Sequence, residues 1–337
     1  MRSLFVIVLL ALLLSSCEKA PDFLSNNDKI TEQGNFLEDY WITAIAFAPD
    51  GSYWFGTMEQ GLIHLQENEI TIYDGSNSDF PDSAWIHDIE IDTRGNVWIA
   101  YNGISVFDGT TFTSIDDSNS SIEGQNIYKI RIDSKGKLWM ASHQNLYEGD
   151  GLNTAITLDP YFEGEKNIPS EMIHSIAIDN DDNVWLAMST YVNEASLVKV
   201  MNDTWEEYDK DDLGFSPYWI KDIACDSRNW VYGVIDYSLS SAMRSGEPLA
   251  FCYDGNTTET FVLPDTVENV VISQGIRMDS YDRAWIYGFH SINILSEGDW
   301  IFNYRSEEDI NIFTLELLSP DVAWLGTDQG VIVFRLD

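Results

Sequence analysis

The five histidines are the side chains best suited to acid–base or metal chemistry near neutral pH. No two of them show His-x-x-x-His spacing, and the three cysteines show no Cys-x-x-Cys spacing, so the usual zinc-ligand patterns are absent from the sequence. The sequence also lacks the Gly-x-Ser-x-Gly turn of many hydrolases and a glycine-rich loop that could hold phosphate. These observations predict a protein that is not an enzyme, with no metal and no cofactor.

Carboxylates greatly outnumber cationic side chains: 56 Asp and Glu against 18 Lys and Arg give a formal net charge of −38. Nucleic acids and anionic membrane surfaces are held by clusters of Lys and Arg, so both are excluded as partners. Two acidic runs, Asp179–Asp182 and Asp209–Asp212, could attract Ca²⁺, but Thr190 and Ile220 occupy the position where an EF-hand loop needs Glu. The charge is therefore interpreted as favouring solubility.

An aromatic residue recurs at a regular interval, each time on a strand-like run after a turn, which reads Asp-x-x-Gly at Asp92–Gly95 and Asp133–Gly136 and is a weaker copy elsewhere. The seven positions are Trp54, Trp98, Trp139, Trp185, Tyr232, Trp285 and Trp324. Their spacings of 44, 41, 46, 47, 53 and 39 residues match the repeat length of a four-stranded propeller blade. Each aromatic is expected to pack between neighbouring sheets, and each turn Asp to bond its own backbone.

The copy from Trp85 to Asp116 shows how one repeat is built. Its expected strands are Ile86–Ile91, Val97–Ala100, Ile104–Phe107 and Thr111–Ile115, separated by turns that contain glycine. Such a four-stranded meander cannot cover both of its own faces, so it needs neighbours. The sequence thus predicts an all-β protein, a seven-bladed β-propeller of four-stranded antiparallel blades over residues 41–337.

The seventh copy has only three expected strands, the last at Val331–Leu336. An earlier segment, at about residues 28–33, lies where a fourth strand would precede the first copy. We therefore expect this segment to pair beside Val331–Leu336 and to close the ring, which removes an exposed sheet edge.

The N-terminal region has the pattern of an exported lipoprotein. A short basic start is followed by the apolar run Leu4–Leu14, too short to span a bilayer, and by Leu-Ser-Ser-Cys ending at Cys17. This pattern predicts a signal peptide over residues 1–16, lipidation of Cys17, and a tether over residues 17–40 that includes the closing strand. The expected location is the bacterial cell envelope, on a membrane through the lipid alone.

The other two cysteines, Cys225 and Cys252, are expected on the first and third strands of the fifth blade. Strands one and three are separated by about 9–10 Å, whereas a disulfide requires Cα atoms within about 7 Å. Both are therefore predicted to remain reduced and buried.

Aromatic and histidine side chains are expected to gather on one rim of the ring, the rim that carries the long and unequal loops. The candidate ligand-binding residues are Trp41, Trp85, Tyr218 and Trp219 at the starts of first strands, and Tyr101, His143, Tyr191, Tyr237, Phe289 and His290 after second strands. Aromatic platforms of this kind suit a neutral polar ligand such as a sugar. The same residues could instead fill gaps between blades, and this alternative stays open.

The repeated phrase Ile-x-x-Ile-x-x-Asp-x-x-Gly-x-x-Trp-Ile, followed by an Asp-Gly turn, resembles the two-component regulator propeller repeat over residues 41–337. The resemblance implies a periplasmic sensor-type propeller that responds to a glycan. Such sensors also carry an Ig-like domain, a membrane span and a kinase, which this sequence does not show, so it would not signal by itself.

Three functional hypotheses follow. The first is a lipid-anchored binding module for an extracellular glycan or peptide. The second is a scaffold for partner proteins in an envelope complex, and the third is a propeller lyase or glycosidase. A concave aromatic pocket would favour the first, a large apolar patch the second, and convergent carboxylates beside a histidine the third.

Overall fold

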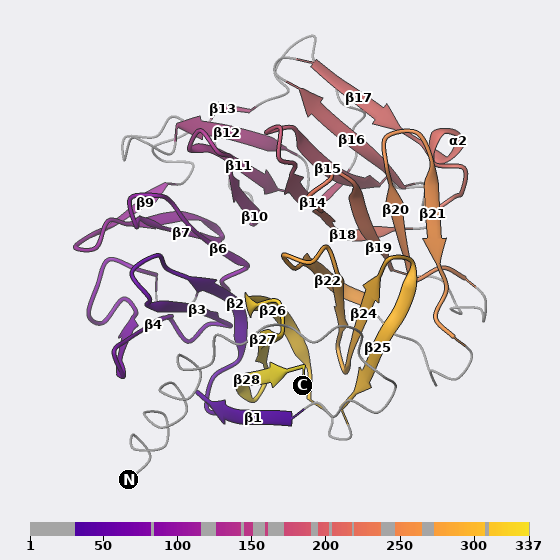
Figure 1. Cartoon of the computed structure of the whole chain (residues 1–337). Helices are drawn as coiled ribbons and strands as arrows, with labels where there is room; N and C mark the ends of the chain where they lie inside the picture. The colour runs from indigo at the N-terminus through magenta and orange to yellow at the C-terminus, as the bar shows by residue number, and fades with distance from the viewer. Residues whose placement is uncertain are drawn as a thin grey trace.

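The described residues form one ring of seven four-stranded antiparallel sheets around a central axis (Figure 1). The computed structural model describes residues 31–81, 84–115, 126–142, 145–150, 159–160, 172–189, 195–201, 204–217, 219–236, 247–264, 273–306 and 310–336. Among these residues, none lies in a helix with the length and apolar character needed to cross a membrane. The signal peptide, Cys17 and the segment before residue 31 lie outside the described residues. The all-β, seven-bladed prediction is confirmed.

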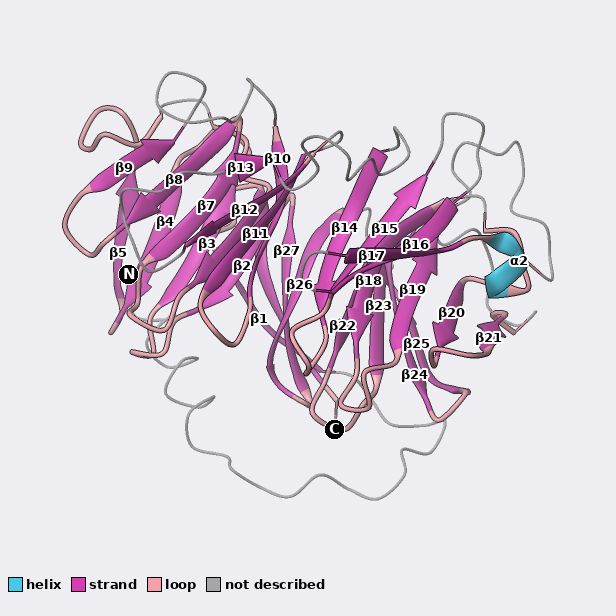
Figure 2. Cartoon of the chain, turned by 90° about the horizontal axis from the view of Figure 1, so that it is seen from above, coloured by secondary structure: helices cyan, strands magenta, loops and turns pink. Residues whose placement is uncertain are grey.

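Each blade runs from an inner strand at the axis to an outer strand at the perimeter. From inner to outer strand, the first blade contains β2 (Ile42–Phe47), β3 (Tyr53–Thr57), β4 (Leu62–Gln66) and β5 (Glu69–Tyr73), the second β6 (Asp88–Ile91), β7 (Val97–Tyr101), β8 (Gly103–Phe107) and β9 (Phe112–Ile115), and the third β10 (Ile127–Ile132), β11 (Lys137–Ser142), β12 (Leu146–Asp150) and β13 (Asp159–Pro160). The fourth blade contains β14 (Met172–Ile178), β15 (Val184–Ser189), β16 (Ala195–Met201) and β17 (Thr204–Tyr208), and the fifth β18 (Ile220–Cys225), β19 (Val231–Ile235), β20 (Ala250–Tyr253) and β21 (Thr258–Phe261). The sixth blade contains β22 (Ser273–Met278), β23 (Ala284–Gly288), β24 (Ser291–Ser296) and β25 (Asp299–Arg305), and the seventh β26 (Ile312–Ser319), β27 (Val322–Thr327), β28 (Gly330–Arg335) and β1 (Thr31–Phe36). A one-turn helix, α2 (Lys210–Leu213), lies at the edge of the ring (Figure 2).

The ring is closed by β1, which pairs antiparallel with β28 from the opposite end of the chain (Figure 1). Phe36 pairs with Val331, and Thr31 pairs with Arg335. The prediction that an N-terminal strand closes the ring is therefore confirmed. The strand was expected at about residues 28–33, and β1 spans Thr31–Phe36, three residues later in the chain. Phe36 explains this register, because its buried ring packs edge-on against Phe55 of the first blade and Trp324 of the seventh.

The turn between the inner and second strands is held by its aspartate. In the sixth blade, Asp279 accepts hydrogen bonds from the backbone N–H groups of Tyr281 and Arg283, at 2.8 and 3.0 Å. The same carboxylate accepts the indole Nε1–H of Trp285 at 2.9 Å, six residues further on. Asp92 and Trp98, Asp133 and Trp139, and Asp179 and Trp185 repeat this bond. The aspartate therefore holds the turn and the tryptophan together, which is more than backbone capping.

The seventh blade lacks this aspartate. Leu318 stands six residues before Trp324, as Ala48 does before Trp54 in the first blade, whereas blades two to six have Asp at this position. The indole Nε1 of Trp324 accordingly has no hydrogen-bond partner among the residues that the structure describes, although the residue is fully buried.

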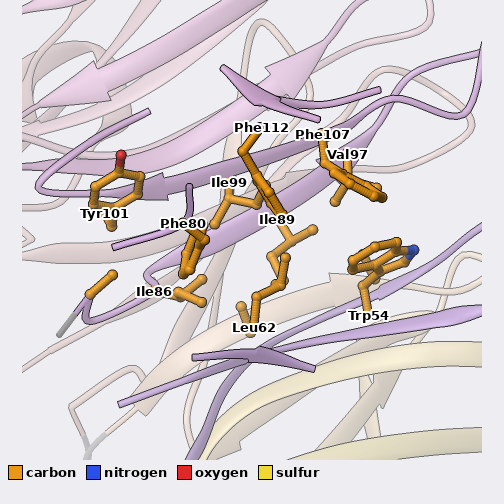
Figure 3. Close-up of a cluster of buried hydrophobic side chains, with 13 residues drawn as sticks. Trp54, Leu62, Phe80, Ile86, Ile89, Val97, Ile99, Tyr101, Phe107 and Phe112 are labelled. Carbon is orange, nitrogen blue, oxygen red and sulfur yellow. The ribbon is translucent and has the colours of Figure 1, made fainter. Parts of the chain in front are cut away.

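The apolar core lies between blades. Between the first and second blades, Trp54 and Leu62 face Phe107 and Phe112 across the interface (Figure 3). Trp98, Trp285 and Trp324 are 0 % exposed in equivalent interfaces, which confirms the structural role predicted for the repeated aromatics.

The two described cysteines, Cys225 on β18 and Cys252 on β20, have free thiols, as predicted; Cys252 is buried, whereas Cys225 is only half-buried. Tyr232 of β19 pairs with residues of both strands and lies between them. Burial raises the pKa of both thiols, that of Cys252 to about 12. Neither thiol is therefore a nucleophile near neutral pH.

Candidate functional site

The inner strands share an irregularity at the end from which the chain enters them. In six of the seven blades a β-bulge leaves one residue out of the pairing register there, as between Ile42 and Ala44 or between Ile220 and Asp222. A bulge bends the strand and turns the extra side chain out of the pleat. In the second blade His87, immediately before β6, holds the equivalent position.

These positions place one side chain from every blade around the axis. The seven residues, called the mouth ring, are Thr43, His87, Tyr128, His174, Lys221, Gln274 and Phe313. All seven line one cavity of about 320 Å³, called the mouth pocket, together with Trp85, Ile86, Lys129, Ile173 and Asp222. The pocket lies at the opposite end of the inner strands from the Asp-x-x-Gly turns.

Aromatic rings form an arc along one side of the mouth pocket. Phe313 lies against Trp41 with ring centroids 5.9 Å apart, and Trp85 lies 5.4 Å from His87. His87 in turn lies 5.0 Å from Tyr128. Trp41 and Trp85 are 45 % and 47 % exposed, so both offer a free ring face for stacking.

On the far side of the mouth pocket, the His174 ring is fixed by two neighbours. Its Nε2 lies 2.6 Å from the Ser189 hydroxyl and also contacts the indole Nε1 of Trp219. An indole N–H can only donate, so Nε2 of His174 is an acceptor and the proton of the neutral ring is on Nδ1. Trp219 therefore orients the histidine and does not itself line the pocket.

The base of the mouth pocket is an ion pair that reaches across the axis. Lys129 of the third blade lies 3.7 Å from Asp222 of the fifth blade, and Arg277 of the sixth blade lies 3.4 Å from the same carboxylate. Burial alone would raise the pKa of Asp222, but Lys129, Arg277 and a hydrogen bond from Ser175 hold it below its ordinary value. Burial lowers the pKa of Lys129, which Asp222 opposes.

Beyond this ion pair, a second cavity of about 300 Å³ lies toward the Asp-x-x-Gly face. Arg131 bonds Asp88 at 2.9 Å and Glu90 at 3.2 Å, while Arg277 bonds Glu316 at 3.1 Å. Burial raises the pKa of Glu90 to about 7; Arg131 opposes this rise and Asp88 adds to it.

The free edges of several inner strands are capped by side chains of the preceding blade. Asp88 accepts the N–H of Ile130 at 3.0 Å, and Asp222 accepts the N–H of Ile276 at 3.1 Å. Ser175 accepts the N–H of Ile223 at 3.4 Å. These donors are consequently occupied and do not face the channel as an open strand edge.

The structure separates the sequence-predicted ligand residues into three groups. Trp85 lines the mouth pocket, and Trp41 and Trp219 pack directly against residues that line it. His143, Tyr191, Tyr218 and Tyr237 lie outside the described residues.

The third group lies away from the pocket. Tyr101 is buried beside Phe80, with its hydroxyl 2.9 Å from Ser105, and offers no open platform (Figure 3). Phe289 and His290 hold a loop, where His290 Nδ1 lies 2.8 Å from the Ile310 carbonyl oxygen. Tyr101 therefore fills a gap between blades, the alternative that the sequence left open.

None of the seven mouth-ring residues was predicted from the sequence as a site residue. His87 and His174, the two histidines of the ring, were assigned no role. The usable signal is an isoleucine directly before the ring residue in six of the seven blades, as in Ile86-His87 and Ile220-Lys221, whereas Gln274 follows Ser273. Hydrophobic alternation could not reveal it, because a bulge breaks the two-residue period.

The side chains at the mouth can bind by stacking, by hydrogen bonding and by one cationic contact. Two histidines and a tyrosine also supply groups able to transfer protons. Within the part of the chain that the structure describes, no group of three or more His, Cys, Asp or Glu is arranged to hold a metal ion.

Comparison with known proteins identifies the architecture and not the family. No family model matches the chain, and no curated protein matches it. Among solved structures, a catalytically inactive virginiamycin B lyase from Staphylococcus aureus with quinupristin is similar, with a TM-score of 0.72 and 12 % identity over 92 % of this chain and 99 % of that one. YCF48 bound to D1 peptide gives a TM-score of 0.66 and 10 % identity over 95 % of this chain and 100 % of that one.

The extracellular domain of the putative hybrid two-component system BT3049 from B. thetaiotaomicron is also similar. It gives a TM-score of 0.68 and 17 % identity over 92 % of this chain, which spans 41 % of that one. The corresponding domain of the putative one-component system BT4673 gives 0.65 and 16 % over 88 % of this chain and 40 % of that one. At these identities the likeness establishes a shared propeller fold.

Proposed function

We propose that this chain is a ligand-binding propeller of the bacterial cell envelope, held on a membrane by lipid at Cys17, and that it takes a glycan or a peptide in the mouth pocket. The observation that carries the proposal is the mouth ring, in which every blade contributes one side chain to a single concave pocket. Ligand sites are typically concave, with aromatic walls and a few convergent polar groups. Sensor-type propellers among the similar structures, and the resemblance to the two-component regulator propeller repeat, support the same function.

The test is a screen of the tagless mature protein against glycan and peptide arrays, followed by paired measurements on variants. Trp85→Ala removes a ring that is 47 % exposed at the pocket, and we expect binding about ten-fold weaker with little change in melting temperature. Trp98→Ala, at a fully buried tryptophan, is the matched control and should cost about 3–5 kcal/mol of stability. If Trp85→Ala unfolds the protein as Trp98→Ala does, or leaves ligand affinity unchanged, the mouth pocket is not the site.

A second candidate function, an enzyme of lyase type, is favoured by one observation. His87 and His174 both face the mouth pocket, and Tyr128 lies beside His87, so groups able to donate and accept protons converge there. The test is turnover of ligands found in the screen. Loss of turnover with retained binding in His87→Gln would support the enzyme, whereas unaltered ligand after prolonged incubation would exclude it.

A further inference from the structure

The mouth pocket carries the opposite charge balance from the rest of the molecule. The whole chain has about three acidic side chains for each basic one. The mouth pocket instead has two lysines, Lys129 and Lys221, against one carboxylate, Asp222. The mouth pocket is thus lined by more cationic than acidic side chains, unlike the chain as a whole.

That single carboxylate is already compensated. Asp222 interacts with Lys129, with Arg277, with the Ser175 hydroxyl and with the N–H of Ile276. The ammonium of Lys221, by contrast, has no ion pair or hydrogen bond with any residue that the structure describes. A half-buried ammonium without a partner favours an anionic group placed against it.

The remaining walls restrict what kind of anion fits. Trp85 lines the pocket and Trp41 lies beside it; both are about half exposed, and an exposed indole face suits the face of a sugar ring. A peptide that adds as a strand would need free donors on the inner strands, but those of Ile130, Ile223 and Ile276 are capped by side chains. The volume of about 320 Å³ is at the small end of the ~300–1,000 Å³ range of ligand pockets, which limits the ligand to a short one.

The charge of the whole chain sets a further limit. A net charge of −38 repels a long polyanion, whereas one carboxylate can still reach the local cation. A compact ligand with a single acidic ring at its end satisfies both conditions.

We propose that the mouth pocket binds a short, carboxylate-bearing sugar, with the carboxylate on Lys221 and the sugar ring on Trp85. This inference deepens the proposed function and rests on it. The two remain separable, because a neutral glycan or a peptide bound at the same pocket would keep the proposed function and overturn the acidic sugar.

The experiment measures binding by calorimetry and tryptophan fluorescence with a defined panel. The probes are mono-, di- and trisaccharides of galacturonic, glucuronic and N-acetylneuraminic acid, the carboxyl methyl ester of each, and a short acetylated oligoglutamate. We expect at least one free acid to bind, its methyl ester to bind about ten-fold or more weakly, and the oligoglutamate not to compete. Added salt should weaken binding of the acid more than that of the ester.

Two lysine variants provide the matched comparison. Lys221→Met should weaken binding of the acid about ten-fold or more and leave binding of its ester unchanged, and Lys221→Arg should restore part of the loss. Lys135→Met removes the same charge from the opposite face, where the side chain is 76 % exposed, and should leave affinity unchanged. Equal binding of acid and ester, tighter binding of the oligoglutamate, no binding of any sugar acid, or an unaffected Lys221→Met variant would each overturn the proposal.

Discussion

Replacement of Phe36 by alanine tests whether the N-terminal strand closes the ring. Phe36 is 7 % exposed and packs against Phe55 of the first blade at 5.8 Å and against Trp324 of the seventh at 5.3 Å. It is the described side chain of β1 that contacts both blades at the closure. The variant removes this contact and leaves the strand backbone able to pair with β28.

The expected loss follows from the burial of the ring. Truncating a buried phenylalanine costs about 3–5 kcal/mol. With an unfolding entropy of about 2.1 cal/mol/K per residue over roughly 300 folded residues, that loss lowers the melting temperature by about 5–8 °C. Because the loss falls at the closure, we also expect the amides of β28 to exchange with solvent before those of the third strands of the other blades.

The assay combines urea unfolding with hydrogen exchange, and Phe107→Ala serves as the control. Phe107 is also 7 % exposed, but it lies within the interface between the first two blades. Its variant should lose similar stability without selective exchange in β28. A Phe36→Ala variant that loses less than about 1 kcal/mol, or that shows no early exchange in β28, would refute the ring-closing role.

Three further predictions test the turns, the channel and the anchor. Asp279→Asn should cost roughly 3 kcal/mol by urea unfolding, because the Trp285 indole and the Arg283 guanidinium lose a shared buried carboxylate; an unchanged midpoint would contradict the role of that contact. Glu90 has a pKa raised by burial from 4.5 to about 7, so the stability linked to its protonated form is full below about pH 4.5 and is lost as pH rises through 7. The Glu90 side chain is 30 % exposed, so solvent screening reduces this effect on stability. We expect Glu90→Gln to raise the melting temperature, relative to the unmodified protein, by about 2 °C at pH 8 and by less at pH 5. An equal rise at both pH values would contradict the raised pKa of Glu90. Cys17→Ser should abolish incorporation of a fatty-acid label and release the protein from membranes, and retained label would exclude lipidation of that cysteine.

The fold was predictable because its signal is repeated. A tryptophan six residues after a turn aspartate recurs along the chain, and in the structure Asp279 and Trp285 are joined by a hydrogen bond. Local chemistry and global architecture therefore agree at the copies that carry both residues, and the spacing of the aromatics alone gives the number of blades. The limits of the closing strand were less predictable, because they depend on where Phe36 meets Phe55 and Trp324, residues distant in the chain.

The candidate site was predictable only in part. Trp85 and Trp219 stand out in the sequence as aromatics at strand entrances, but their different roles depend on neighbours from other blades. Tyr101 has the same sequence features and is buried between blades. Exposure at a rim is set by the packing of neighbouring sheets, which residue type and spacing do not reveal.

The sequence by itself determined the repeat, the number of blades and the excess of negative charge, because each is a property of local pattern or of composition. Only the tertiary structure decided that His87, His174 and Lys221, which are far apart in the chain, line one pocket. It also decided that Lys129 and Asp222 meet across the axis, since closing the ring brings the third and fifth blades face to face. A bulge shifts one side chain in six of the seven inner strands, and ring closure turns these separate local shifts into a single site.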